Sequence, residues 1–194
     1  TAQEAALSLI ASRFPGGSVH VLAPLSTDAD VRAAGLVPLR GDESVDCVYL
    51  GFDQSVEYAR LDRAFAALDR GAEFFAAHAD RSYPHGVGRR SMGLGGAVHA
   101  VSFAANREPI LCGKPEARFF DQGLKRLGLR AEECVMVGDS IFSDLTGARN
   151  AGLRACALVL TGTYRLCDPL PTGLSPDIVL ESVADVPTWV KSLS

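Results

Sequence analysis

The sequence lacks the patterns of membrane and nucleic-acid-binding proteins. It contains no apolar run near the ~20 residues that a helix needs to span a bilayer. Basic charge is also scarce, because 23 Asp and Glu outnumber 19 Lys and Arg and the net charge is −4. A basic surface is what attracts nucleic acid or an anionic membrane. We therefore expect neither of them as a partner.

Several enzyme motifs are absent as well. There is no Gly-Lys-Ser/Thr phosphate loop, no Gly-x-Ser-x-Gly elbow and no His-Glu-x-x-His pair, which excludes P-loop NTPases, serine hydrolases and zinc proteases. No Cys-x-x-Cys pair occurs among the five cysteines, which are Cys47, Cys112, Cys134, Cys156 and Cys167. Their odd number and their apolar surroundings indicate reduced, buried thiols in a cytoplasmic protein.

What the chain does contain is a regular alternation of strand and helix patterns. Hydrophobic residues make up 47% of its 194 residues, enough for one substantial core or two small ones. The expected helices cover about 2–13, 58–68, 98–105, 117–127 and 186–190, and the expected strands 19–23, 45–52, 73–77, 135–137, 155–160 and 177–180. Strands that alternate with helices through short connecting segments predict an α/β fold with a parallel or mixed sheet.

The most informative stretch is the apolar run 135–137, which ends in Gly138-Asp139 and is followed by Asp144. Such a run reads as a buried parallel strand, and side chains at its carboxyl end project into the crevice where α/β sheets bind ligands. Two carboxylates there suit Mg²⁺, which leaves its other positions to water and substrate oxygens. The alternative is an N-cap Asp followed by an ordinary first-turn acid.

Upstream of this strand lies Gly113-Lys114-Pro115, just before a helical pattern. Ala117, Phe120, Leu124 and Leu127 recur at steps of three and four residues and predict one apolar helix face. Pro115 suits the first turn of that helix, because its missing N–H would have no partner there. Lys114 is then held at a helix start, where anions are also favoured. The alternative is a solvated lysine that happens to precede a helix.

Together these two stretches resemble the haloacid dehalogenase (HAD) superfamily of phosphohydrolases. Gly113-Lys114-Pro115 is similar to its third motif, and Gly138-Asp139-Ser140 through Asp144 is similar to its fourth. From residue 1 to about 163 the order of elements is similar to the subfamily with a large inserted α/β cap, of the NagD-like, 4-nitrophenylphosphatase and phosphoglycolate phosphatase type. The family's first motif, Asp-x-Asp, and its phosphate-binding Ser or Thr are not found in this sequence.

The resemblance implies a HAD-like doubly wound core with its C-terminal half present, plus an inserted α/β cap domain. Residues 1–18 would be the core-to-cap helix, 19–110 the cap and 111–194 the C-terminal half of the core. The implied activity is Mg²⁺-dependent hydrolysis of a small phosphorylated metabolite, in which Asp139 binds the metal, Lys114 neutralises charge at the phosphate and Asp144 orients the metal waters or Lys114. Without the nucleophile motif, we expect this chain to be inactive by itself. A non-catalytic HAD-like binding protein is the alternative.

The interpretation of two further segments depends on the same resemblance. His78, Asp80 and Arg81 follow the strand at 73–77, where the family's cap loop selects the substrate, although a solvated loop is the simpler interpretation. Asp28-x-Asp30 is the one stretch that imitates the missing nucleophile motif. Its position after Ser26-Thr27 favours an N-cap and first helical turn instead. Finally, a core without its leading strands would leave 135–137 at a sheet edge, so that self-association into a homo-oligomer is expected.

Overall fold

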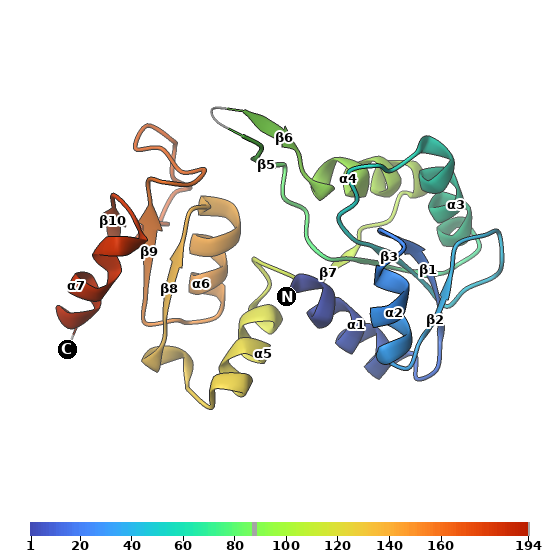
Figure 1. The fold of residues 1–194 in the computed structure, drawn as a ribbon, viewed down its shortest axis with the longest axis horizontal. Coiled ribbons are helices and arrows are strands. Elements are labelled where there is room, and N and C mark those ends of the chain that lie inside the picture. The colour runs from blue at the N-terminus through green and yellow to red at the C-terminus, as the bar shows by residue number, and fades with distance from the viewer. Residues whose placement is uncertain (87–88, 194) are drawn as a thin grey trace. The chain divides into compact units, whose positions relative to one another are not determined.

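The computed structural model describes residues 1–86 and 89–193 and divides the chain into two compact units (Figure 1). Unit 1 covers Thr1–Gly113 and unit 2 covers Lys114–Ser194. The assignment of 1–18, 19–110 and 111–194 as core-to-cap helix, cap and core half stays a prediction. In the part of the chain that the structure describes, no helix combines the length and the apolarity needed to cross a bilayer.

Unit 1 is built on a five-stranded parallel sheet in the order β2-β1-β3-β4-β7. Its strands are β1 (Ser18–Leu22), β2 (Val37–Leu39), β3 (Cys47–Leu50), β4 (Glu73–Ala76) and β7 (Ile110–Leu111). All four residues of β3 are buried, which suits a central strand covered on both faces. The predicted α/β class is therefore confirmed, and the sheet is parallel throughout.

Two pairs of helices cover this sheet, α1 and α2 on one face and α3 and α4 on the other (Figure 1). Their bounds are α1 (Ala2–Arg13), α2 (Thr27–Ala33), α3 (Tyr58–Asp69) and α4 (Leu94–Ala105). Thr1 and Glu4 form a capping box that satisfies the first free N–H groups of α1. Gln3 Nε2 donates to Asp30 Oδ2 at 2.6 Å and links α1 to α2.

A two-stranded antiparallel hairpin follows β4, made of β5 (Ser82–Pro84) and β6 (Arg90–Met92). No strand was predicted from the sequence between residues 78 and 97, so this hairpin was missed. Each strand has three residues and is only half-buried or exposed, so no alternation of apolar and polar residues marks it. Pro84 can occupy such a strand because a two-stranded hairpin has two free edges.

Unit 2 contains a smaller parallel sheet in the order β10-β9-β8. Its strands and helices are α5 (Ala117–Leu127), the 3-10 turn η1 (Ala131–Glu133), β8 (Val135–Gly138), the π-helix η2 (Ile141–Leu145), α6 (Thr146–Asn150), β9 (Ala155–Val159), β10 (Ile178–Leu180), the 3-10 turn η3 (Val183–Asp185) and α7 (Val186–Lys191). Central β9 is buried along its whole length, whereas β8 pairs with β9 alone within the described residues and forms one edge.

Two details of α5 differ from the sequence prediction. Glu116 is the N-cap, so Pro115 lies before the helix rather than in its first turn. Leu127 is 67% exposed and does not extend the apolar face, which ends at half-buried Leu124. The helix closes immediately afterwards, because Gly128 adopts a left-handed conformation at φ 66°.

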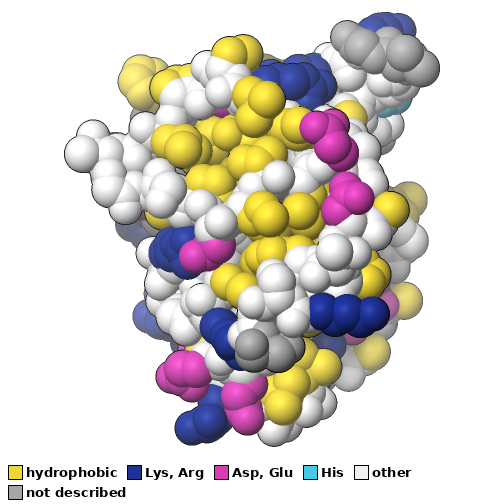
Figure 2. Space-filling view, turned by 90° about the vertical axis from the view of Figure 1, so that its left-hand side faces the viewer, with side chains coloured by type: hydrophobic (Ala, Val, Ile, Leu, Met, Phe, Trp, Pro, Cys, Tyr) yellow, Lys and Arg dark blue, Asp and Glu magenta, His cyan; other side chains and the backbone are white. Residues whose placement is uncertain are grey.

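Unit 2 also leaves large hydrophobic side chains in solvent. Leu166 is 71% exposed, Val183 64%, Phe142 60% and Val190 42%. Figure 2, turned toward the left-hand end of Figure 1, shows hydrophobic side chains gathered over this part of the chain. Concentrated apolar surface of this kind favours association with another surface.

Candidate active site

Asp139 is positioned directly after the last residue of β8, where the sequence prediction put it. Its Oδ2 accepts a hydrogen bond from the Thr163 backbone N–H at 2.6 Å, and its carbonyl oxygen accepts one from Thr163 Oγ1 at 2.6 Å. Thr163 belongs to the segment that follows β9, the neighbouring strand. The carboxylate is thus fixed from a second strand end. Its other oxygen, Oδ1, has no hydrogen-bond partner among the described residues.

Asp144 is the most buried acidic residue of this region, at 2% exposure. Its Oδ1 lies 2.5 Å from Lys114 Nζ, and its Oδ2 accepts the backbone N–H groups of Asp139 at 2.9 Å and Ser140 at 3.1 Å. A buried carboxylate is costly unless it is paired and hydrogen-bonded, and this one is both. Because both oxygens are engaged, Asp144 serves to hold Lys114 and the turn after β8 in place.

The local backbone makes this arrangement possible. Residues 141–145 wind as a π-helix, an uncommon form that is frequent at functional sites, and this winding turns Asp144 back toward the end of β8. Ser140 starts the π-helix, and its side chain accepts the Ser143 N–H at 3.2 Å. A Cβ on Gly138 would lie 2.3 Å from Asp144 Cγ, so only glycine permits this approach.

A second glycine, Gly162, has the same function on the other side of the site. A Cβ at this position would lie 2.1 Å from Asp139 Oδ2. Neither Gly162 nor Thr163 was predicted to be a site residue from the sequence. The signal that could have found them is their place: they follow a buried strand, as Gly138 and Asp139 do, and neighbouring parallel strands end at the same edge of a sheet.

The donor set determines which metal this site can take. Among the described residues, no three His, Cys, Asp or Glu side chains lie close enough together to hold a metal ion by themselves. What the site offers is the half-buried carboxylate of Asp139 with Oδ1 available. Mg²⁺ binds in this way, through one or two carboxylates with waters and substrate oxygens in its remaining positions. The residues present therefore fit Mg²⁺ and do not fit a closed structural zinc site.

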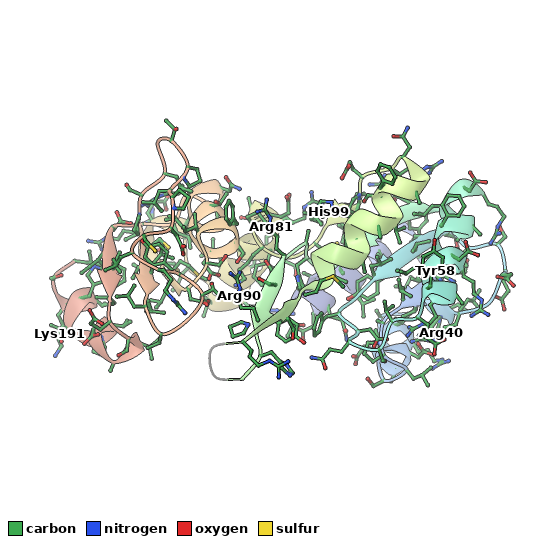
Figure 3. The ribbon with its side chains drawn as sticks, turned by 90° about the horizontal axis from the view of Figure 1, so that it is seen from above. Arg40, Tyr58, Arg81, Arg90, His99 and Lys191 are labelled. Atoms are coloured by element: carbon green, nitrogen blue, oxygen red, sulfur yellow. The ribbon has the colours of Figure 1, made fainter. Side chains whose placement is uncertain are left out.

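The predicted substrate-binding residues lie in unit 1, in the segment between β4 and β5. His78 Nδ1 is 3.1 Å from Asp80 Oδ2, and both side chains are partly exposed. Arg81 is exposed and directly precedes β5 (Figure 3). The structure thus brings Lys114, Asp139 and Asp144 together in unit 2, and within unit 1 it brings His78 against Asp80. The substrate-binding role of the unit 1 residues stays a prediction.

Asp28 and Asp30, the imitation of a nucleophile motif, lie in the first turn of α2 as expected. They do not cap the helix, because Ser26 occupies the N-cap position. Ser26 itself makes no side-chain capping bond. Instead Asp28 Oδ1 accepts hydrogen bonds from Arg40 Nη2 at 2.6 Å and Nε at 3.1 Å. A carboxylate engaged in this way by a guanidinium is a structural ion pair.

A family model described as HAD-like hydrolases matches residues 111–186. The acid sugar phosphatase of Staphylococcus aureus is 33% identical over 176 residues, which are 91% of this chain and 67% of that protein. The chain spans from about half to two thirds of the length of the curated relatives that it matches, namely 48%, 61% and 67% for three of them.

Solved structures that are similar to this chain are phosphatases as well. A 4-nitrophenylphosphatase from Thermotoga maritima superposes with a TM-score of 0.86 at 28% identity, covering 97% of this chain and 71% of that one. A glycerol phosphate phosphatase from Mycobacterium tuberculosis, solved in complex with magnesium, superposes with a TM-score of 0.78 at 30% identity, covering 89% of this chain and 54% of that one.

Proposed function

This chain belongs to the HAD-like hydrolase family, of the NagD and 4-nitrophenylphosphatase type, and from that membership we propose that it carries the metal- and lysine-bearing half of a Mg²⁺-dependent phosphomonoester hydrolase. The observation that carries the proposal is the arrangement of Lys114, Asp139 and Asp144 at the end of β8. A small phosphorylated metabolite is the proposed substrate class. The five cysteines, all free in the structure, support the proposal of a cytoplasmic location.

Asp139 is the proposed metal ligand, through the carboxylate oxygen that Thr163 leaves available. When bound, Mg²⁺ would neutralise negative charge on the phosphate oxygens. The protein's own contribution is orientation. Thr163 holds one oxygen of Asp139 and Gly162 leaves space for the carboxylate, so the ligand does not need to reorganise.

Lys114 is the proposed charge-neutralising group beside the transferred phosphate. Its ammonium is a compact point charge with three donors, and the contact with Asp144 uses one of them. A further two N–H bonds remain for phosphate oxygens or for a nucleophilic carboxylate. Asp144 is therefore a positioning residue, which acts through Lys114 and through the backbone of Asp139.

The reaction implied by the family is phosphoryl transfer to an Asp carboxylate, followed by hydrolysis of the acyl phosphate. Asp28 does not fit the role of nucleophile, since its Oδ1 accepts two hydrogen bonds from the Arg40 guanidinium. We therefore propose that the 194-residue chain alone does not turn over phosphomonoesters. His78, Asp80 and Arg81 are the proposed selectors of the leaving group.

Metal binding by the 194-residue chain is the direct test, because it requires no turnover. Titration calorimetry with MgCl₂ should detect binding that Asp139→Asn weakens at least tenfold. The matched control is Asp121→Asn, which removes an exposed carboxylate from α5 and should leave the affinity unchanged. Equal Mg²⁺ affinity in Asp139→Asn and in the unaltered chain would contradict the assignment.

Activity is the second test, with 4-nitrophenyl phosphate as substrate. The 194-residue chain should release no phosphate, and a longer protein that supplies an Asp-x-Asp strand should release it in a Mg²⁺-dependent reaction. Asp139→Asn should abolish that reaction with little loss of fold, since the substitution keeps the size of the side chain and removes its charge. A robust rate in the short chain that is lost on Asp28→Asn would show instead that Asp28 is the nucleophile.

A further inference from the structure

Lys114 is held by Asp144 at the end of its side chain, and the backbone that carries it also has to be fixed. A lysine ammonium stands on a flexible four-carbon stem, so one contact at its end does not define its direction. Lys114 is the first residue of unit 2, and Gly113 before it belongs to unit 1. Within unit 2, the backbone at Lys114 is therefore fixed from Pro115 onward.

Pro115 offers a single backbone group for such a contact. It has no N–H, so its carbonyl oxygen is the only backbone atom that can take part in a hydrogen bond. Helix α5 begins one residue later, because Glu116 is the N-cap and its carbonyl accepts the Phe119 N–H at 3.0 Å. The Pro115 carbonyl instead accepts a hydrogen bond from Asn150 Nδ2 at 3.1 Å. Asn150 is the last residue of α6, so this bond ties the start of unit 2 to that helix.

Close packing between α5 and α6 supports this bond. The two helices lie side by side in unit 2 (Figure 1). Gly147 of α6 is buried at their contact, and a Cβ there would lie 2.4 Å from Phe120 Cε2 and 3.2 Å from Pro115 Cα. The missing side chain lets α6 approach Pro115 closely enough for the amide of Asn150 to reach its carbonyl.

The same stretch of chain carries Asp144. Helix α6 follows directly on the π-helix η2 that contains Asp144, and Thr146 Oγ1 donates to Ile141 O at 2.9 Å across their junction. Residues 114–115 are thus bound at two points to residues 144–150, through the ammonium and through the Pro115 carbonyl. Releasing the second point frees the stem of the lysine and weakens the first.

We propose that Asn150 is a positioning residue for Lys114, which acts through the Pro115 carbonyl. With its stem and its end both fixed, the ammonium keeps its two remaining N–H bonds in a set direction for phosphate oxygens. This inference rests on the function proposed for Lys114. It adds to that function a residue of α6 whose own side chain bonds only to backbone in the structure described here.

Acetylation of lysine amines tests the proposal in the 194-residue chain, without metal or turnover. The chain has three lysines, Lys114, Lys125 and Lys191. An ammonium paired with a carboxylate reacts slowly, so the rate at Lys114 reports how much of the time it is released from Asp144. Lys125 and Lys191 (Figure 3) are exposed and serve as references within the same molecule. Mass spectrometry of peptides after limited acetylation gives the rate at each lysine.

Asn150→Ala should raise the acetylation rate of Lys114 about three- to fivefold relative to Lys125, the change that loss of one ordinary hydrogen bond produces in a local equilibrium. Asn150→Asp should raise it at least as much, because it keeps the shape of the side chain and turns an oxygen toward the Pro115 carbonyl. Gln122→Ala is the matched control, since it removes an amide from α5 that makes no hydrogen bond within the described residues. It should leave the rate at Lys114 unchanged.

Asp144→Asn separates this inference from the function proposed for Lys114. It removes the charged partner and should raise the rate at Lys114 by itself. If Asp144→Asn raises that rate and both Asn150 variants leave it unaltered, the positioning role is overturned and the Lys114–Asp144 pair stands. An unaltered rate in Asp144→Asn would contradict the pair, and with it both proposals. An equal rise at all three lysines in both Asn150 variants would show a general loss of structure and would also overturn the positioning role.

Discussion

Lys114 Nζ lies 2.5 Å from Asp144 Oδ1, and the other oxygen of the same carboxylate accepts the backbone N–H groups of Asp139 and Ser140. One buried carboxylate thus fixes both the proposed cation beside the phosphate and the turn that carries the proposed metal ligand. Lys114 and Asp144 are 30 residues apart in sequence. Their geometry is set together, so a change at Asp144 affects both.

We predict that Asp144→Ala lowers the free energy of unfolding of unit 2 by about 2–4 kcal/mol, because three charge-assisted hydrogen bonds are lost and two backbone N–H groups lose their acceptor. Asp144→Asn should do less damage than Asp144→Ala, and in an active, longer protein it should reduce the rate less than Asp139→Asn does. Urea unfolding followed by circular dichroism measures the first effect. A loss below about 0.5 kcal/mol for Asp144→Ala would mean that the carboxylate is not held as described.

A second prediction concerns Gly162, where a Cβ would lie 2.1 Å from Asp139 Oδ2. Gly162→Ala should displace the Asp139 carboxylate and weaken Mg²⁺ binding at least tenfold in calorimetry. Gly123→Ala is the matched control, because Gly123 lies within α5 with no neighbouring atom within 4 Å of the added Cβ. That control should stabilise the helix by up to about 1 kcal/mol and leave Mg²⁺ affinity unchanged. Equal affinities in both variants would show that Gly162 does not shape the site.

The third prediction concerns pH and His20, which lies in β1 at 2% exposure. Burial, and after it the charge of Arg40, lowers the pKa of this imidazole below its ordinary value of 6.5. Below pH 6.5, His20 is protonated in the unfolded chain but stays neutral in the folded one. The free energy of unfolding therefore falls as the pH drops from 6.5 toward the folded-state pKa. His20→Leu should flatten this dependence in thermal unfolding, whereas His99→Leu, at an exposed position, should not. An unchanged pH slope in His20→Leu would contradict the prediction.

The fourth prediction is self-association through unit 2. Among the described residues, β8 pairs only with β9 and so leaves backbone groups of its other edge unpaired, and Leu166 and Val183 expose apolar surface in the same unit. Light scattering after size exclusion should therefore detect species larger than one chain. Val183→Lys together with Val190→Lys should shift the distribution toward the monomer, and Tyr58→Lys in unit 1 should not. A clean monomer for the unaltered chain would show that the edge of β8 is protected.

The sequence predicted those parts of the candidate site that depend on local pattern. A short apolar run ending in Gly138-Asp139 gives a strand and a carboxylate at its end without knowledge of any distant contact. Lys114 before an amphipathic helix is a local pattern too. Their proximity could be expected from the alternation of strand and helix, which places successive strand ends at one edge of a parallel sheet.

What the sequence did not predict depends on long-range contacts. Thr163 reaches Asp139 because β9 pairs with β8, and the bond joins residues 24 positions apart. The hairpin β5–β6 has too few residues for a visible period, and so does β2. The π-helix at 141–145 turns Asp144 so that it contacts Lys114, and no helical periodicity in the sequence indicates that contact.

All five strands of the unit 1 sheet come from one uninterrupted segment of the chain, residues 1–113. On the ribosome this segment is complete before Lys114 is added. Because domains fold as units during synthesis, the sheet of unit 1 needs no residue of β8 or β9 to be complete. A released fragment that ends at Gly113 should therefore already hold the complete five-stranded sheet.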